Sequence, residues 1–310
     1  MCIRDSKRGH TEPALRTENP MQENGPTLYK EEQREARRMA NYISENARKV
    51  TTTMLTEKKK QGQRISMLTA YDYTMGGLVD RAGIDMILIG DSASNVMAGN
   101  ETTLPITLDQ MIYHARSVAR AAKHALVVCD MPFGTYQVCT EDALRAAVRI
   151  MAESGVDAVK LEGGEPVIKT VKALVQAGIP VCGHLGLTPQ SVHVFGGFGL
   201  RAKEDAEAQQ LIKDAKALQE AGCFAIVLEK IPAKLTEQVC AELTIPVIGI
   251  GAGTADGQVL VLQDMLGMND GFHPKFLRQY ANIGQQISEA VAHYADDVRQ
   301  GNFPSEKESY

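Results

Sequence analysis

The sequence lacks the features that would indicate a membrane or a nucleic acid as a partner. No run approaches the roughly 18 consecutive apolar residues that a membrane-spanning helix needs. No long basic stretch is interleaved with aromatic residues, and the formal net charge of the chain is −5. A nucleic-acid-binding surface is therefore not expected. We expect neither a membrane nor a nucleic acid among the partners of this protein.

The cysteines show no pattern of a metal site or of a disulfide framework. All six are scattered without a CxxC pair, at Cys2, Cys129, Cys139, Cys182, Cys223 and Cys240. Three of them, Cys129, Cys182 and Cys223, fall in or beside apolar runs. This pattern predicts reduced core thiols in a cytoplasmic protein, and neither zinc nor disulfide bonds.

The first 50 residues differ from the rest of the chain. They are polar and charged, with a KEEQREARR segment, and they contain no apolar core of a secretory signal. Their many glutamates argue against a mitochondrial transit peptide. Residues 29–50 could form an exposed helix with a thin apolar stripe. We predict a disordered or loosely docked extension over residues 1–50 and a catalytic domain over residues 51–310.

Beyond residue 64, short apolar runs alternate with segments of helical periodicity. The apolar runs are ISMLTA (65–70), MILIGD (86–91), ALVVCD (125–130), AVKLEGG (158–164), IPVCGHLG (179–186), FAIVLEK (224–230), IPVIGIGAG (245–253) and GQVLVLQD (257–264). Most are followed by apolar residues at i, i+3, i+4 spacing, which indicates helices, and a closing helix is predicted near residues 276–298. Several helical patterns stop at a glycine before the next run, as at Gly83, Gly155, Gly178 and Gly222.

Eight such units over about 240 residues match the size of a (β/α)8 TIM barrel. An open, doubly wound α/β sheet is the alternative fold. That fold usually carries a GxGxxG or Walker loop after its first strand, whereas this chain has TAYDYT at residues 69–74. The sequence therefore favours the barrel.

Charged residues end the middle strands of this predicted barrel. At or near the ends of the second to sixth predicted strands stand, in order, Asp91, Asp130, Glu162, His184 and Glu229. A lone carboxylate at a strand end often only caps the next helix or loop. Four at one rim indicate an active site, because active sites lie at the carboxyl ends of barrel strands.

The chemistry of this rim points to a hard cation. Lys160 lies two residues before Glu162, so both side chains are predicted to face the barrel interior. Oxygen ligands without a nearby cysteine favour magnesium over zinc, and magnesium at a barrel end typically stabilises an enolate. The residues alone leave two features open. His184 could serve the pocket or only bond a neighbouring strand, and the loop at 193–199 could be a lid or a plain crossover.

Several motifs resemble those of the ketopantoate hydroxymethyltransferase family. They are TAYDY (69–73), GDS (90–92), ETTLPIT (101–107), KLEGGE (160–165), VCGHLGLTPQS (181–191) and IPVIGIGAG with DGQVLV (245–261). The resemblance runs from about Thr52 to the FPSEKES tail. It implies a barrel of the phosphoenolpyruvate/pyruvate type, a bound Mg²⁺ and a homodecamer.

The resemblance also implies a reaction. The family transfers a hydroxymethyl group from the cosubstrate 5,10-methylenetetrahydrofolate to 3-methyl-2-oxobutanoate, through an enolate that magnesium stabilises. The product is 2-dehydropantoate, in pantothenate biosynthesis.

The resemblance implies roles for individual residues. By motif position, Asp91, Asp130 and Glu162 would bind the metal. The oxo acid would be held by Asp91, Ser92, Asp130 and Lys160, with His184 lining the pocket. Glu229 matches the proton acceptor of the family.

Two other functions fit parts of the pattern. A magnesium-dependent carbon–carbon lyase of the same barrel superfamily would place a catalytic cysteine in a KKCGH-type loop. Here Cys182 stands in VCGH after apolar residues, which disfavours that role. A catalytically silent barrel that serves as a scaffold would have little reason to keep the complete charged rim.

Overall fold

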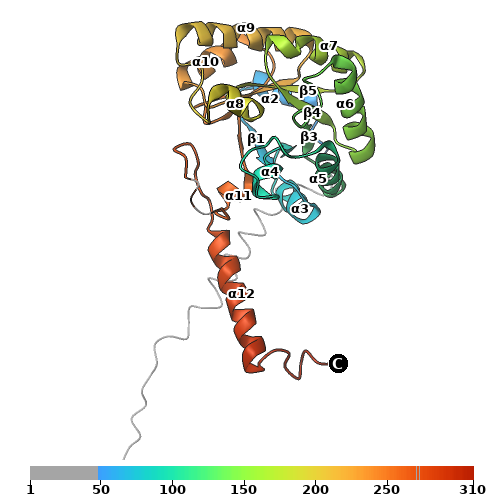
Figure 1. Ribbon diagram of the computed structural model, residues 1–310, viewed down its shortest axis with the longest axis vertical. Coiled ribbons are helices and arrows are strands. Elements are labelled where there is room, and N and C mark those ends of the chain that lie inside the picture. Colours follow the sequence, from blue (N-terminus) through green and yellow to red (C-terminus); the bar gives the residue numbers. More distant parts are fainter. Residues whose placement is uncertain (1–47, 270, 272) are drawn as a thin grey trace, which may run out of the picture. The chain divides into compact units, whose positions relative to one another are not determined.

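The computed structural model describes residues 48–269, 271 and 273–310, and their core is a closed barrel of eight parallel strands (Figure 1). Each strand pairs with the next along the chain, and β8 returns to β1. The strands are β1 (Ile65–Thr69), β2 (Met86–Ile89), β3 (Leu126–Asp130), β4 (Ala158–Glu162), β5 (Val181–Gly186), β6 (Ala225–Glu229), β7 (Val247–Ile250) and β8 (Gly257–Leu260). The predicted barrel is confirmed, and the open sheet is excluded.

Amphipathic helices surround the barrel, each with a buried apolar stripe (Figure 1). They are α3 (Tyr73–Arg81), α5 (Leu108–Ala121), α6 (Thr140–Ser154), α7 (Ile168–Gln176), α9 (Asp205–Ala221) and α10 (Ala233–Glu242). The predicted glycine stops are present, because Gly155 and Gly222 end α6 and α9 in the left-handed conformation. Short helices follow the carboxyl ends of several strands: α4 (Ala93–Val96), η1 (Glu165–Val167), η2 (Pro189–Ser191), α8 (Val192–Phe195) and α11 (Leu262–Met265).

The barrel interior changes from apolar to charged along its axis. Because successive side chains on a strand point to opposite faces, every second residue of each strand enters the interior. The lower interior positions form one apolar cluster: Ile65, Met67, Met86, Leu88, Leu126, Val128, Ala158, Cys182, Ala225, Val227, Ile248 and Val259. The next positions upward are Asp130, Lys160, His184 and Glu229. The same alternation therefore buries the apolar layer and presents the charged layer at the carboxyl rim.

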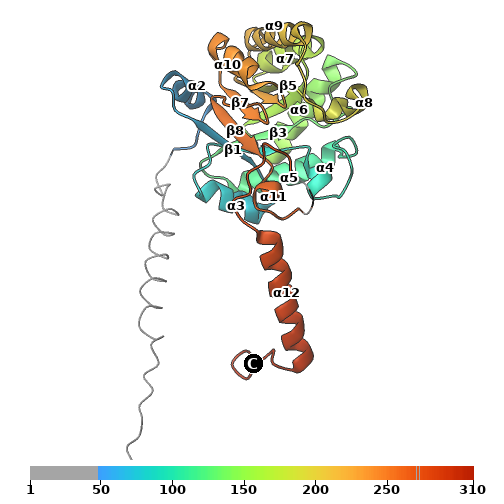
Figure 2. The same ribbon diagram turned by 90° about the vertical axis from the view of Figure 1, so that its left-hand side faces the viewer.

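A helix that the sequence analysis did not predict, α2 (Thr52–Lys60), closes the opposite end of the barrel (Figure 2). Its Leu55 is 0% exposed and packs into the apolar cluster of the interior. Lys59 forms an ion pair of 2.7 Å with Asp256, just before β8. Because α2 fills this end, the carboxyl rim is the only open end of the barrel among the described residues.

The predicted closing helix is displaced from its expected place. It was expected near residues 276–298, and the structure has α12 at Ile283–Gln300. The segment before it bonds α11 instead of continuing a helix, since the amides of Tyr280 and Ile283 donate to the carbonyls of Met265 and Leu266. No residue of α12 is buried, so it does not cover the barrel as the other helices do.

The structure describes only the last three residues of the predicted extension, residues 48–50. The rest of that prediction lies outside the described residues. Lys49 forms an ion pair of 2.8 Å with Asp157. The backbone amide of Val50 donates a hydrogen bond of 2.7 Å to the carbonyl of His124. Among the described helices, none combines the length and the apolar character needed to cross a bilayer.

Candidate active site

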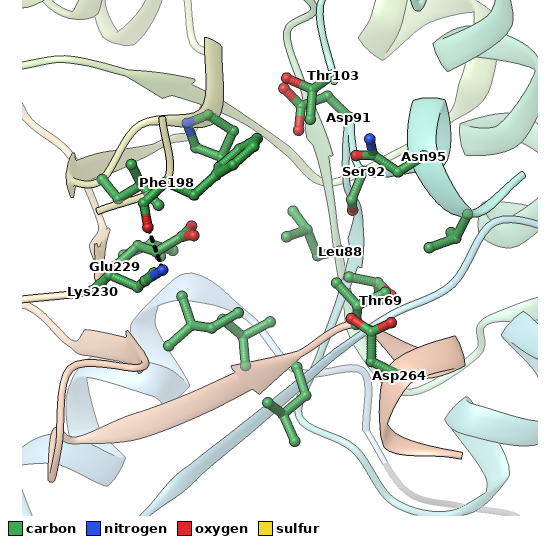
Figure 3. Close-up of a pocket in the computed structure, with 18 of the residues that line it drawn as sticks. Thr69, Leu88, Asp91, Ser92, Asn95, Thr103, Phe198, Glu229, Lys230 and Asp264 are labelled. Carbon is green, nitrogen blue, oxygen red and sulfur yellow. Dashed lines mark hydrogen bonds between the residues drawn. The ribbon is translucent and has the colours of Figure 1, made fainter. Parts of the chain in front are cut away.

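A pocket of about 710 Å³ opens at the carboxyl ends of the barrel strands. All seven residues that the sequence analysis selected line it: Asp91, Ser92, Asp130, Lys160, Glu162, His184 and Glu229. Figure 3 shows Glu229 and Lys230 on one side of the pocket, with Asp91 and Ser92 on the other. The structure therefore brings the whole predicted set together around one cavity.

Asp130 and Lys160 form a buried ion pair at the base of the pocket. The Nζ atom of Lys160 lies 2.8 Å from Oδ1 of Asp130, and both side chains are 4% exposed. Burial opposes the charge on Lys160, but Asp130, Glu162 and Asp91 outweigh it and raise the pKa of the ammonium group. Lys160 therefore keeps a fixed positive charge where an anionic substrate would bind.

Gly90, the first residue of the GDS motif, lies close to the side chain of Ser92. A Cβ atom at Gly90 would lie 2.6 Å from the hydroxyl oxygen of Ser92, so a side chain does not fit there. The amide of Asp91 donates a hydrogen bond of 3.0 Å to Oδ2 of Asp130. The glycine of the GDS motif thus leaves room for the hydroxyl of Ser92.

Asp91 is a carboxylate under strong electrostatic pressure. Burial raises its pKa to about 8, together with the negative charges of Asp130 and Glu162, while Lys160 and a hydrogen bond from Gln190 act in the opposite direction. At neutral pH a large part of this group holds a proton unless a positive ligand arrives. A cation bound here would relieve the repulsion among the three carboxylates.

His184 joins Glu162 to Glu229. Its Nδ1 atom lies 3.3 Å from Oε1 of Glu162, and its Nε2 atom lies 3.4 Å from Oε2 of Glu229. Burial and Lys160 favour neutral imidazole, but the two carboxylates outweigh them and raise the pKa of His184 to about 9. The Nδ1 atom also lies 3.3 Å from Nζ of Lys160. Because the ring holds both protons, that contact is a repulsion rather than a hydrogen bond.

Gln190, a buried residue that the sequence analysis did not single out, bonds two of the residues that line the pocket. Its side-chain amide donates to Oδ2 of Asp91 at 2.9 Å, and its backbone amide donates to Oε2 of Glu162 at 3.0 Å. Its own Oε1 atom accepts a hydrogen bond of 2.6 Å from the hydroxyl of Tyr136. Gln190 therefore orients two of the predicted metal ligands, and its position in the VCGHLGLTPQS motif was the available signal.

Tyr71 holds Ser92 in place. The two hydroxyl oxygens lie 2.8 Å apart, and the tyrosine side chain is 1% exposed. Burial raises the pKa of Tyr71, although the hydrogen bond to Ser92 lowers it in part. The phenol therefore stays neutral. Tyr71 belongs to the TAYDY motif, which was noticed in the sequence without a role for this residue.

The donor atoms suit a hard divalent cation, although they do not converge on one point as they stand. Oδ1 of Asp130 and Oε1 of Glu162 are buried without a hydrogen bond, despite the charged groups near them. No group of three His, Cys, Asp or Glu side chains in the described residues is arranged to hold a metal ion. Oxygen-only ligands with unused lone pairs match the preference of magnesium.

The loop that was predicted as a lid or a crossover lies against the pocket. It forms α8 and a turn, and Phe198 lines the cavity. The carbonyl of Phe198 accepts a hydrogen bond from the side chain of Lys230, drawn as a dashed line in Figure 3. The loop therefore contributes to the wall of the pocket, and whether it moves stays a prediction.

Cys182 is a core residue. Its side chain is 0% exposed within the apolar interior cluster, and burial raises the pKa of its thiol to about 12. Such a thiol is neutral and poorly nucleophilic. The surroundings of this residue therefore argue against a catalytic role of the lyase type.

Solved structures of low sequence identity share this fold. A phosphonopyruvate hydrolase in complex with oxalate and Mg²⁺ matches with a TM-score of 0.54 and 12% identity, over 84% of this chain and 93% of that chain. A 2,3-dimethylmalate lyase, a member of the PEP mutase/isocitrate lyase superfamily, matches with a TM-score of 0.53 and 15% identity, over 84% and 91%. These likenesses show the barrel fold that the sequence analysis predicted.

Curated proteins share much more of the sequence. The 3-methyl-2-oxobutanoate hydroxymethyltransferase of Bacteroides thetaiotaomicron is 64% identical over 273 residues, covering 88% of this chain and the whole of that protein. The enzyme of the same name from Flavobacterium johnsoniae is 60% identical over 264 residues, covering 85% and 97%. The profile of the ketopantoate hydroxymethyltransferases matches residues 49–306. This chain belongs to the ketopantoate hydroxymethyltransferase family.

Proposed function

We propose that this protein transfers a hydroxymethyl group from 5,10-methylenetetrahydrofolate to 3-methyl-2-oxobutanoate and so forms 2-dehydropantoate for pantothenate biosynthesis. The observation that carries the proposal is the 64% identity to a 3-methyl-2-oxobutanoate hydroxymethyltransferase over its full length. The charged pocket supports it, because its groups suit an oxo acid that must lose a proton.

Asp91, Asp130 and Glu162 are the proposed ligands of a magnesium ion. Their support is the set of crowded, buried oxygens described above, two of which have no hydrogen bond. Bound there, the ion would supply positive charge to the carboxylate and the 2-oxo group of the substrate, which makes the neighbouring C3–H bond more acidic.

Lys160 and Ser92 complete the binding of the oxo acid in this proposal. Lys160 is 4% exposed and charged, so it can attract the substrate carboxylate and offset negative charge that develops on the 2-oxo oxygen. The hydroxyl of Ser92 is held by Tyr71 and can donate to a substrate oxygen. Asp91 and Asp130 would also contact the oxo acid.

Glu229 is the proposed base that removes the proton from C3. It lines the same pocket, and its side chain is 16% exposed, so a substrate can reach it. His184 lies 3.4 Å away, which keeps the carboxylate oriented by a positive charge. The resulting enolate carbon then bonds to the methylene carbon as one C–N bond of the folate breaks. Water supplies the hydroxyl group as the second C–N bond breaks, and tetrahydrofolate leaves with its two nitrogens protonated by the proton from C3 and the one that water gives up.

Assembly and location are also part of the proposal. The apolar side chains of Ile287, Val291, Tyr294 and Val298 lie at i, i+4, i+7 and i+11 on α12 and are 46–60% exposed. This face supports association with further copies of the chain, which we propose form a homodecamer. The five described cysteines are free, which supports a cytoplasmic location.

The proposal is tested by assaying product formation with the purified protein, with 3-methyl-2-oxobutanoate and 5,10-methylenetetrahydrofolate as substrates. We expect 2-dehydropantoate only when Mg²⁺ is present, and loss of product after treatment with EDTA. Folate-independent cleavage of oxaloacetate-like or 2-methylisocitrate-like acids would favour the lyase instead. No turnover of any of these acids would favour a silent scaffold.

A further inference from the structure

The pocket contains a carboxylate that the proposed chemistry does not use. Asp264 lies in α11, just after β8, and lines the cavity. Figure 3 shows it beside Thr69, on the side of the pocket away from Glu229. It is absent from the motifs that drew attention in the sequence, and no Lys or Arg of the described residues forms an ion pair with it.

The backbone fixes the position of Asp264. The amide of Leu262 donates a hydrogen bond of 2.9 Å to the hydroxyl of Thr69, and the Leu262 side chain is 2% exposed. On the other side of α11, the amide of Tyr280 donates to the carbonyl of Met265 at 2.8 Å. The carboxylate is therefore presented by a segment anchored to both β1 and the chain before α12.

Only one of the two oxygens of Asp264 has a hydrogen-bond partner among the described residues. Oδ1 accepts a hydrogen bond of 2.7 Å from the side-chain amide of Asn269. The group is half-buried, and burial raises its pKa although the bond from Asn269 lowers it in part. A ligand that donates hydrogen bonds would stabilise the charged form.

The surroundings of Asp264 are apolar and leave room for more than a small oxo acid. Among the lining residues, Leu260, Val261 and Met268 lie within four residues of Asp264 along the chain. The whole cavity, at about 710 Å³, lies within the range of roughly 300–1,000 Å³ that suits larger ligands. Figure 3 shows Asp264 across the pocket from Glu229 and Lys230, and the cavity is large enough for a flat ring with a polar edge beside it.

We propose that Asp264 binds the aminopyrimidinone edge of the tetrahydropterin ring of the folate cosubstrate. That edge presents two adjacent donors, the N3–H and the 2-amino group, and a carboxylate accepts from both at once. The apolar lining packs against the faces of the ring. The proposal rests on the proposed function, because it assigns the second substrate of that reaction to this end of the pocket.

The test compares wild-type protein with the Asp264→Asn variant. Asparagine keeps an oxygen that can accept from Asn269, so a purely structural role survives, but its NH₂ group faces the ligand's donors. We expect the Kd for tetrahydrofolate and the KM for 5,10-methylenetetrahydrofolate to rise roughly tenfold to hundredfold. Exchange of the C3 proton of 3-methyl-2-oxobutanoate with D₂O, measured without folate, should stay within about twofold. Asp142→Asn, on the exposed face of α6, is the matched control.

A ligand change tests the same contact without relying on the variant's folding. The wild-type protein should bind 2-desamino-2-methyl-tetrahydrofolate roughly tenfold more weakly than tetrahydrofolate. The two analogues should differ much less in Asp264→Asn, because the lost donor faced the replaced carboxylate.

Specific results would overturn the inference. An unchanged Kd for tetrahydrofolate in Asp264→Asn would do so, as would an equal loss of proton exchange, or equal binding of the two folates by the wild type. If the wild-type protein forms 2-dehydropantoate and any of these occurs, only this inference fails. A wild type that forms no product overturns the proposed function itself.

Discussion

The alternation of side chains along β3 to β6 explains which residues of these strands reach the pocket. Alternate residues of β4 face the interior, so Ala158 belongs to the apolar layer while Lys160 and Glu162 belong to the charged one. The sequence was sufficient to predict this, because the spacing of two fixes the shared face of Lys160 and Glu162. It was also sufficient to place Asp91, Asp130 and Glu229 at the same rim.

Other residue-level features could not be read from the sequence. Gln190 reaches Asp91 across a separation of 99 residues, and Tyr71 reaches Ser92 from the loop after β1. These contacts depend on how the loops after β1 and β5 fold over the rim, and no local periodicity encodes that. Asp264 was not singled out either, because α11 has only four residues and shows no helical pattern.

The pKa of His184 predicts how stability depends on pH in metal-free protein. It rises from 6.5 to about 9 on folding, so the protonated ring stabilises the folded state. This contribution is complete below about pH 6.5 and is lost as the pH rises through about 9. The pKa of Asp91 rises from 3.8 to about 8, so its protonated form also stabilises the folded state. This contribution too is lost as the pH rises, through about 8.

Urea unfolding in EDTA at pH 6.5 and at pH 9 would measure this effect. The free energy of unfolding of the wild type should fall between the two values, and the His184→Gln variant should show a smaller fall. An equal fall in both proteins would show that His184 does not carry the dependence.

At the scale of elements, the end of β5 depends on a glycine. Gly186 has a φ of +89°, and a Cβ atom there would lie 2.3 Å from the carbonyl oxygen of Glu229. That oxygen accepts a hydrogen bond of 2.8 Å from the amide of Leu187. A side chain at this position would therefore strain both β5 and the backbone of the proposed base.

Gly186→Ala should lower the free energy of unfolding by about 3 kcal/mol or more, because a steric clash adds to the backbone strain. Gly155→Ala is the control, since Gly155 has a φ of +79° with no atom within 4 Å of the added Cβ. It should cost only about 1–2 kcal/mol. Equal losses in denaturant titrations would mean that the contact with Glu229 contributes nothing.

The helices illustrate where periodicity works and where it fails. It predicted α5, α6 and α9, whose apolar stripes pack on the barrel. It also indicated a helix near α12, but it could not show that the apolar stripe of this helix stays uncovered within the described chain. Periodicity reports that a face is apolar and does not identify the surface that covers it.

At the scale of the whole molecule, the exposed apolar face of α12 leads us to expect that copies of the chain associate. Val291 is 60% exposed at the centre of the apolar face, and an aspartate there would place a charge in any interface that the face forms. Val291→Asp should therefore reduce the molar mass measured by light scattering, from that of a decamer to smaller species. Gln285→Lys, on the polar face, should leave it unchanged. A wild type that is already monomeric would contradict the proposed assembly.

The proposed function divides the four carboxylates of the rim between two tasks. Asp91 and Glu162 both accept hydrogen bonds from Gln190, and Asp130 accepts one from the amide of Asp91. Glu229 lies across the pocket from Asp91 (Figure 3), and its neighbour is His184 at 3.4 Å. The sequence placed all four at one rim, and the family resemblance suggested the division. The proposal for catalysis depends on this division more than on any other feature.

The most direct test follows the C3 proton of 3-methyl-2-oxobutanoate by NMR in D₂O, with Mg²⁺ and without folate. In Glu229→Gln the exchange should fall by about a hundredfold or more, since general bases typically contribute roughly 10²–10⁴-fold, while the Kd for Mg²⁺ stays close to that of the wild type. In Asp130→Asn, exchange and Mg²⁺ binding should be lost together. Exchange at the wild-type rate in Glu229→Gln would contradict the assignment of Glu229 as the base.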